Sequence, residues 1–253
     1  MQRDVDQFVE LGYCVVRGAV PPAVAGRVVG HVRDHDRSPP QPWHLVERSV
    51  YDLPTLVEAV TAAVRAAFDR LTGSVGWHLA ANWGFPVRGP GPLAPLWHID
   101  GDWFRHHVHA GDQVLTPIFL WQDVGENDGP TLLAAGSHQE VARLLAEHEP
   151  DGIAGDRIGD VVNQHVQPSR VDAATGRAGD VYVCHPFLAH SVNPVGCARP
   201  RFISNVAVHG RGPLRVTAAS GPLSPVEVPV AGALDRCGAL PAALEDPVAD
   251  RFD

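Results

Sequence analysis

The order of apolar and polar residues predicts a helical first part of the chain. Residues 4–11 fit a short helix, and the alternating, β-rich stretch YCVVRGAV at 13–20 fits a strand. A second helix is predicted in PPAVAGRVVGHVRDHD at 21–36, because proline is favoured in the first helical turn. Between 52 and 72, apolar residues recur every three or four positions, which predicts one amphipathic helix with Gly73 after its end.

From residue 76 onward, the pattern changes to short apolar runs separated by Gly, Pro, Asn and Asp. One helix is predicted among them, HQEVARLLAEHE, with Ser137 as its cap. Residues 88–95 fit a rigid loop, 150–160 a mobile surface loop, and 211–253 a loop followed by a C-terminal helix. The segments that fit strands are GWHLAANWGF (76–85), VLTPIFLWQDV (114–124), PTLLAA (130–135), DVYVCHPFLA (180–189) and RFISNVAVHG (201–210).

Several short strands with turn residues between them are typical of a β-barrel or β-sandwich. With 253 residues, 45% of them hydrophobic and 19% charged, the chain is long enough for one large globular domain. We therefore expect a single domain over residues 1–253. In it, a strand and helices within 1–75 would pack on a β core of residues 76–210, and residues 211–253 would form a C-terminal extension.

Charge and cysteine content narrow the partners and the compartment. The net charge of -9 argues against a nucleic acid or an anionic membrane as partner, since either would favour a basic surface. The four cysteines form no CxxC pair and are expected to be free thiols in a reducing compartment. The acidic start MQRDVDQFVELGY is unlike a secretion signal, and no run of about 18 apolar residues occurs, so we expect a soluble cytoplasmic protein.

Two segments carry residues that could bind a metal ion. His98 and Asp100 lie two positions apart in PLWHIDGDWF and would face the same side of a strand. His190, in HPFLAHSVNPVGCARPRF, is predicted to close the strand of 180–189, which barrel closure could bring beside the first segment. Two imidazoles and one carboxylate are the ligand set of a non-haem Fe(II) oxygenase. A structural zinc site would instead use four ligands, commonly with cysteine.

A third residue could bind a carboxylate cosubstrate. Arg201 lies eleven positions after His190, on the next predicted strand, and a guanidinium binds a carboxylate in a bidentate manner. Arg199 is the competing candidate, but it precedes Pro200 and is expected in the turn before the strand.

These segments resemble the phytanoyl-CoA dioxygenase family of Fe(II)- and 2-oxoglutarate-dependent oxygenases. The resemblance runs from about residue 8 to 210. It rests on FVELGYCVVRGAVPPAVAGRV, WHIDGD, ENDGPTLLAAGSH and AGDVYVCHPFLAHSVNPVGCARPRF, which occur in the order of the family's motifs. It implies a mainly β fold with flanking helices around a double-stranded β-helix, also called a jelly roll.

The resemblance also implies an activity and roles for residues. His98, Asp100 and His190 would bind Fe(II), and Arg201 would pair with the C5 carboxylate of 2-oxoglutarate. O2 would be consumed, and succinate and CO2 released, while a C–H bond of a small organic molecule is hydroxylated. Asp100 argues against halogenation, because related halogenases have a small residue at this position. Further candidates are Asn82 for the C1 carboxylate, Thr131 for the C5 end, and Trp103 and His106 for the substrate entrance.

Departures from the family pattern and rival functions remain. Ala135 and Val192 stand where relatives commonly have Pro and Ser, which leaves the cosubstrate contacts open. An enzyme of the same fold could use the same iron chemistry for epimerisation, desaturation or cyclisation. A non-catalytic metal- or ligand-binding jelly roll is a second rival, and a cupin-type enzyme a third. The intact triad with Arg201 argues against the non-catalytic jelly roll. The cupin-type enzyme would need a Glu near its His-x-His motif, and His107-Val108-His109 lacks one.

Overall fold

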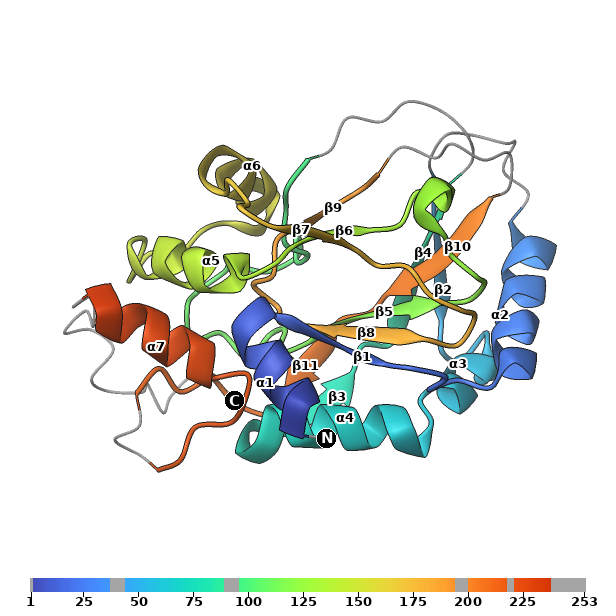
Figure 1. Cartoon of the computed structure of the whole chain (residues 1–253), viewed down its shortest axis with the longest axis horizontal. Coiled ribbons are helices and arrows are strands. Elements are labelled where there is room, and N and C mark those ends of the chain that lie inside the picture. The colour runs from blue at the N-terminus through green and yellow to red at the C-terminus, as the bar shows by residue number, and fades with distance from the viewer. Residues whose placement is uncertain (1, 37–43, 89–95, 194–199, 218–220, 238–253) are drawn as a thin grey trace.

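Antiparallel β-sheet with flanking helices makes up most of the chain (Figure 1). The structure is a computed structural model, and it describes residues 2–36, 44–88, 96–193, 200–217 and 221–237. The larger sheet has six strands, each antiparallel to its neighbours. Their order across the sheet is β1 (Tyr13–Val16), β8 (Val181–Cys184), β5 (Thr116–Leu120), β10 (Arg201–Asn205), β4 (Asn82–Arg88) and β2 (His44–Ser49).

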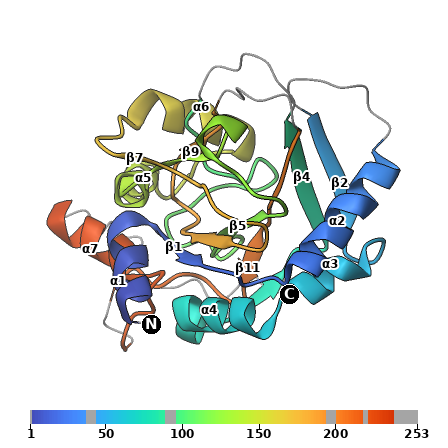
Figure 2. The ribbon, with the colours of Figure 1, turned by 45° about the vertical axis from the view of Figure 1, so that its right-hand side comes forward.

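A smaller sheet lies across from the larger one (Figures 1 and 2). It has the order β7 (Val171–Ala173), β6 (Leu132–Ala134), β9 (His190–Ser191), again antiparallel. A β-bridge between His98 and His190 adds the segment of His98 to the open side of β9. A separate pair joins β11 (Val208–Gly210) to β3 (Trp77–Leu79).

Helices cover the outer sides of both sheets. In Figures 1 and 2, α2, α3 and α4 lie beside the six-stranded sheet, and α5 and α6 lie beside the three-stranded sheet, with α7 packed on α5. Their bounds are α1 Gln2–Leu11, α2 Pro22–His35, α3 Pro54–Ala59, α4 Ala62–Thr72, α5 Ser137–Ala146, α6 Gly155–His165 and α7 Val228–Cys237, with 3₁₀ turns η1 Gly73–Val75 and η2 Glu126–Asp128. In the described part of the chain, no helix is long and apolar enough to cross a membrane.

A large buried cluster joins the sheets to the helices. Its aromatic centre is formed by Trp83, Phe119 and Trp121, whose side chains are at most 2% exposed. The rings of Phe119 and Trp121 stack with centroids 5.2 Å apart, and that of Trp83 lies 5.1 Å from Phe119. Because packed aromatic rings resist displacement, this cluster holds β4 and β5 rigidly in place.

The single helix predicted over 52–72 is wrong, because the structure divides it into α3 and α4. Thr61 causes the break. Its hydroxyl accepts a hydrogen bond from the Val64 amide at 3.4 Å, which caps α4, and donates one to the Ala19 carbonyl at 2.7 Å. Apolar spacing continues across such a cap and does not reveal it. The prediction of Gly73 after the helix end is confirmed, with φ of +52°.

The loop predicted at 150–160 is also wrong, since α6 begins at Gly155. The prediction of Ser137 as the cap of α5 is wrong as well. Gly136 is the cap, and Ser137 is the first helical residue. The Ser137 hydroxyl accepts a hydrogen bond from the Ala189 amide at 2.9 Å. Two of the predicted strands are each divided in two, giving β3 with β4 and β10 with β11, while β2 and β7 were not predicted. The loop at 88–95 lies, beyond Arg88, outside the described residues, as does the chain after Cys237.

Candidate metal centre and its cavity

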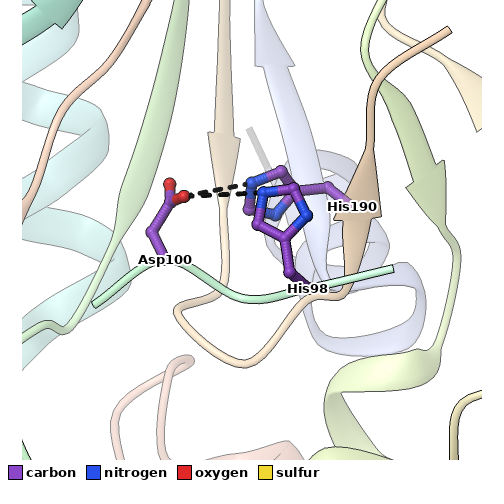
Figure 3. Close-up of side chains that lie close together, drawn as sticks. All are labelled: His98, Asp100 and His190. Atoms are coloured by element: carbon purple, nitrogen blue, oxygen red, sulfur yellow. Dashed lines mark ion pairs between the residues drawn. The ribbon is translucent and has the colours of Figure 1, made fainter. Parts of the chain in front are cut away.

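His98, Asp100 and His190 converge on one point (Figure 3). Each offers one ligand atom, and the three atoms lie within 4.8 Å of one another. Asp100 Oδ1 is 3.4 Å from His190 Nε2 and 3.9 Å from His98 Nε2, and the two imidazole centroids are 4.4 Å apart. The predicted triad is therefore assembled from two distant segments.

The backbone brings these segments together by pairing them directly. The His98 amide donates to the His190 carbonyl at 3.0 Å, and the His190 amide donates to the His98 carbonyl at 2.9 Å. Ile99, between the two ligand positions, is 3% exposed and belongs to the core. Gly101 then turns the chain with φ of +120°, where a Cβ would collide with Phe104 and His106.

The prediction that His190 closes the strand of 180–189 is wrong. β8 ends at Cys184, and the chain turns before His190 starts β9 in the other sheet. A hydrogen bond from the Leu188 amide to the His185 carbonyl at 3.0 Å closes this turn. The turn carries the chain from the larger to the smaller sheet and thereby places His190 opposite the six-stranded sheet.

Both imidazoles present Nε2 to the centre. Nδ1 of His98 lies 2.9 Å from the Leu96 carbonyl, and Nδ1 of His190 lies 3.1 Å from the Leu188 carbonyl. A carbonyl only accepts, so each Nδ1 carries a proton, and Nε2 is the ring nitrogen left to bind a metal ion. His190 Nε2 is buried and has no hydrogen-bond partner among the described residues. This donor set, with an orphaned ring nitrogen beside a carboxylate, fits a divalent metal ion.

Asp100 is held in its ionised form. Burial alone would raise its pKa, but the His190 and His98 imidazoles and the amide of Asn205 outweigh burial, so the pKa of Asp100 lies below its ordinary value. Asn205 Nδ2 donates to Asp100 Oδ2 at 3.4 Å, on the side away from His190. Burial lowers the pKa of His98, and the neighbouring His190 lowers it further, whereas the carboxylate of Asp100 raises the pKa of His190 against the effect of its burial.

The triad opens into a cavity of about 1220 Å³. Arg201, the first residue of β10, lines it with a side chain that is 1% exposed, and its guanidinium donates to the Gly129 carbonyl. Asn82, Thr131 and Trp103 line the same cavity. The structure thus brings all five predicted non-histidine site residues and two of the three predicted histidines to one space. They are Asp100, Arg201, Asn82, Thr131 and Trp103, with His98 and His190.

His106 lies outside this cavity lining. It is 3% exposed, its Nε2 is 2.8 Å from the Gly101 carbonyl, and its ring packs 4.3 Å from that of Phe104. It therefore braces the turn after Asp100. His107 does not line the cavity either and pairs with the buried carboxylate of Glu149 at 3.0 Å. Arg199, the competitor of Arg201, lies outside the described residues.

Two further lining residues were missed by the sequence analysis: Gln113 and Asn205. Each has a buried polar atom without a hydrogen-bond partner among the described residues, namely Gln113 Oε1 and Asn205 Oδ1. Buried polar groups are nearly always paired, so such atoms beside a cavity indicate a polar ligand. For Asn205 a signal existed, because Arg201, Ile203 and Asn205 share one face of β10 and all line the cavity.

No protein-family model and no curated protein matches this chain. Several solved structures are similar to it. The epimerase SnoN, in complex with Fe3+, alpha ketoglutarate and nogalamycin RO, has a TM-score of 0.64 at 17% identity, covering 100% of this chain and 91% of SnoN. HygX from Streptomyces hygroscopicus, with nickel and 2-oxoglutarate bound, has a TM-score of 0.59 at 14% identity, covering 83% and 87%.

The alpha ketoglutarate-dependent carbocyclase SnoK, from nogalamycin biosynthesis, has a TM-score of 0.61 at 17% identity, covering 85% of each chain. At these identities the likeness is one of fold. The resemblance to the phytanoyl-CoA dioxygenase family remains a prediction, since no family model matches. The chain therefore shares its fold with SnoN, SnoK and HygX.

Proposed function

We propose that this protein is an Fe(II)- and 2-oxoglutarate-dependent enzyme with a double-stranded β-helix core, acting on a small organic molecule. One observation carries the proposal: His98, Asp100 and His190 hold three ligand atoms within 4.8 Å of one another at the wall of a large cavity. The neighbours of this fold that bind iron or nickel with 2-oxoglutarate support it. The buried free thiols of Cys14 and Cys184 support a reducing, cytoplasmic setting.

His98, Asp100 and His190 would hold the iron, and Arg201 would hold the distal carboxylate of 2-oxoglutarate. A guanidinium that is 1% exposed gives a carboxylate a strong partner, because little water competes for it. Thr131 would contact the same end. Asn82 would donate to the other carboxylate.

When bound, iron would supply the activation of O2 that couples decarboxylation of 2-oxoglutarate to succinate and CO2 with attack on a substrate C–H bond. The chain's own residues prepare that chemistry. The carbonyls of Leu96 and Leu188 fix the imidazoles with Nε2 inward, and Asn205 fixes the carboxylate of Asp100. The buried walls keep bulk water from the distal carboxylate site.

Hydroxylation is the outcome we propose first. Epimerisation or cyclisation is the second candidate, and a specific observation favours it: the epimerase SnoN covers all of this chain, and the carbocyclase SnoK is also similar. SnoN has been crystallised with nogalamycin RO and HygX with hygromycin B, which supports a small-molecule substrate for the present cavity as well.

The test is succinate formation by anaerobically purified protein given Fe(II), 2-oxoglutarate and O2, compared with its His98→Ala variant. We expect slow succinate formation without added substrate in the wild type and none in the variant. Nickel and 2-oxoglutarate binding, followed by calorimetry, is measured in parallel. Binding of both without turnover would indicate an enzyme that requires its substrate. Failure to bind either would contradict the proposal and leave a ligand-binding protein of the same fold.

A further inference from the structure

The mouth of the cavity carries acidic residues that have no counter-ion in the described part of the chain. Glu47, Asp102, Asp156 and Asp160 all line it, and each is exposed. Among the described residues, none of the four carboxylates takes part in a hydrogen bond or an ion pair. Arg201, the one arginine among the described lining residues, is buried at the cosubstrate end. Arg157, next to Asp156 on α6, does not line the cavity.

Close backbone contacts fix three of these acids beside the metal centre. A Cβ on Gly159 would lie 3.8 Å from the Cβ of His98, so Asp160 follows a residue that faces the triad directly. Gly155 approaches the carbonyls of Asp102 and Phe104 so closely that no Cβ would fit. α6 is thus pressed onto the segment after Asp100, and Asp102, Asp156 and Asp160 belong to one wall.

The usual role of an acid at a helix N-terminus explains only one of them. Asp156 lies in the first turn of α6, where a negative charge is favoured by the helix dipole. Asp160 lies one turn later, beyond that effect, and Glu47 lies on β2, on another wall. Uncompensated like charges around one space disfavour each other unless a cation enters it.

Deeper in the cavity, the unpaired groups include hydrogen-bond acceptors. Gln113 donates its amide to the Thr116 hydroxyl, which leaves Oε1 buried and without a partner among the described residues. Asn205 donates its amide to Asp100, which leaves Asn205 Oδ1 buried and without a partner among the described residues. Both residues line the cavity and are at most partly exposed. An incoming group that donates hydrogen bonds would satisfy these acceptors.

The same mouth has an apolar component. Leu45, Leu96 and Trp103 line the cavity and are 46%, 48% and 60% exposed, which is high for large hydrophobic side chains. An exposed indole favours both a flat apolar body and a nearby cation. At about 1220 Å³ the cavity exceeds the roughly 300–1,000 Å³ of a typical drug-sized site.

We propose that the substrate of this cavity is a protonated amine on a large, apolar, ring-containing body. The inference rests on the proposed function only in taking this cavity as the substrate site. Asp156 and Asp160, with Glu47 opposite, attract the ammonium group, Gln113 Oε1 accepts its hydrogen bonds, and Trp103 with Leu45 and Leu96 covers the rings.

The first test compares two fluorescent probes that differ only in charge: dansylcadaverine, a primary amine, and its N-acetylated neutral form. Both are titrated into the full chain at low ionic strength, with and without nickel and 2-oxoglutarate. We expect the amine to bind about tenfold more tightly, with the difference shrinking at high salt because exposed charges are screened. The D156N/D160N variant should lose about fivefold in affinity for the amine and little for the acetylated probe.

A matched control separates the cavity from the overall charge of -9. The D34N/D235N variant removes the same charge from exposed positions on α2 and α7 outside the cavity, and it should bind both probes as the wild type does. Equal affinities for the two probes, no binding of the amine at millimolar concentration, or an equal loss in the control variant would each overturn the inference.

A second measurement needs no ligand to bind. Two cysteine variants are compared: Trp103→Cys at the mouth, and Val57→Cys on α3, where Val57 is 50% exposed and outside the cavity. For each variant, the labelling rate of the new cysteine is measured with a cationic and with an anionic methanethiosulfonate. We expect the cation to be favoured several-fold more at 103 than at 57, and D156N/D160N to remove most of that preference. Equal ratios at the two positions would overturn the inference. Neither experiment depends on iron, so failure here with intact succinate formation would leave the proposed function standing.

Discussion

His98 and His190 are ninety-two positions apart and yet exchange both backbone hydrogen bonds of one β-bridge, at 3.0 and 2.9 Å. Their imidazoles consequently lie side by side on one face, with centroids 4.4 Å apart. The bridge fixes the spacing of the two candidate ligand atoms through the backbone, which is stiffer than a side chain alone. Asp100, two residues further on the same face, completes the set.

Loss of one ligand should abolish metal binding without unfolding the chain. We expect His98→Ala to weaken nickel binding by at least about 100-fold, because a two-ligand site holds a divalent ion poorly. The side chain of His98 is 31% exposed, so its removal leaves little buried void. Calorimetric titration with nickel gives the affinity, and thermal unfolding gives the stability.

The matched control for that experiment is His35→Ala, which removes an exposed imidazole at the end of α2, far along the chain from the triad. It should bind nickel as the wild type does. Equal weakening in both variants would mean that nickel binds to scattered surface histidines and that the triad is not the metal site.

Arg201→Ala should raise the 2-oxoglutarate concentration needed for half-maximal succinate formation by at least about tenfold. Removing a buried guanidinium leaves a carboxylate in the cavity without its charge partner, at a cost of about 2–3 kcal/mol or more. Arg201→Lys should recover part of the loss, since a lysine keeps the charge but not the forked geometry. An unchanged requirement in both variants would assign the role to another residue.

The convergence of the candidate site residues was predictable because it depends on rare residue types at short spacing. His98 and Asp100 needed only the two-residue period of a strand, and Arg201 needed only its place after His190. The sheet change between β8 and β9 was not predictable, because HPFLA reads as a continuation of the apolar run VYVC. Tertiary pairing with His98, rather than local propensity, sets that break.

The wall of the cavity was missed for a related reason. α6 contains Gly155 and Gly159, which lower helix propensity and suggested a loop. In the structure both glycines allow close approach, to the carbonyls of Asp102 and Phe104 and to His98, and the helix is stabilised by burial of Ile158 and Val162. Likewise β2 buries only Val46, too little apolar pattern to reveal an edge strand.

Acid should destabilise the fold through a buried imidazole outside the metal centre. Burial lowers the pKa of His138 to about 4, against the partial compensation of a hydrogen bond to the Val9 carbonyl at 3.1 Å. Its folded-state pKa lies below its unfolded value, so the unfolded chain binds one more proton between about pH 6.5 and 4. The stabilisation is therefore complete above pH 6.5 and is lost as the pH falls toward 4, by about 3 kcal/mol at most.

His138→Gln keeps a donor for the Val9 carbonyl but cannot be protonated. Urea unfolding between pH 7 and 4.5 should show that the free energy of unfolding falls less steeply with acid in this variant than in the wild type. The slope of this free energy against pH should differ by the contribution of about one bound proton. His185, whose ring lies 5.0 Å from His138, is buried too, and burial holds its pKa well below the ordinary value, so part of the slope should persist. A variant slope identical to that of the wild type would show that His138 is not the group being titrated.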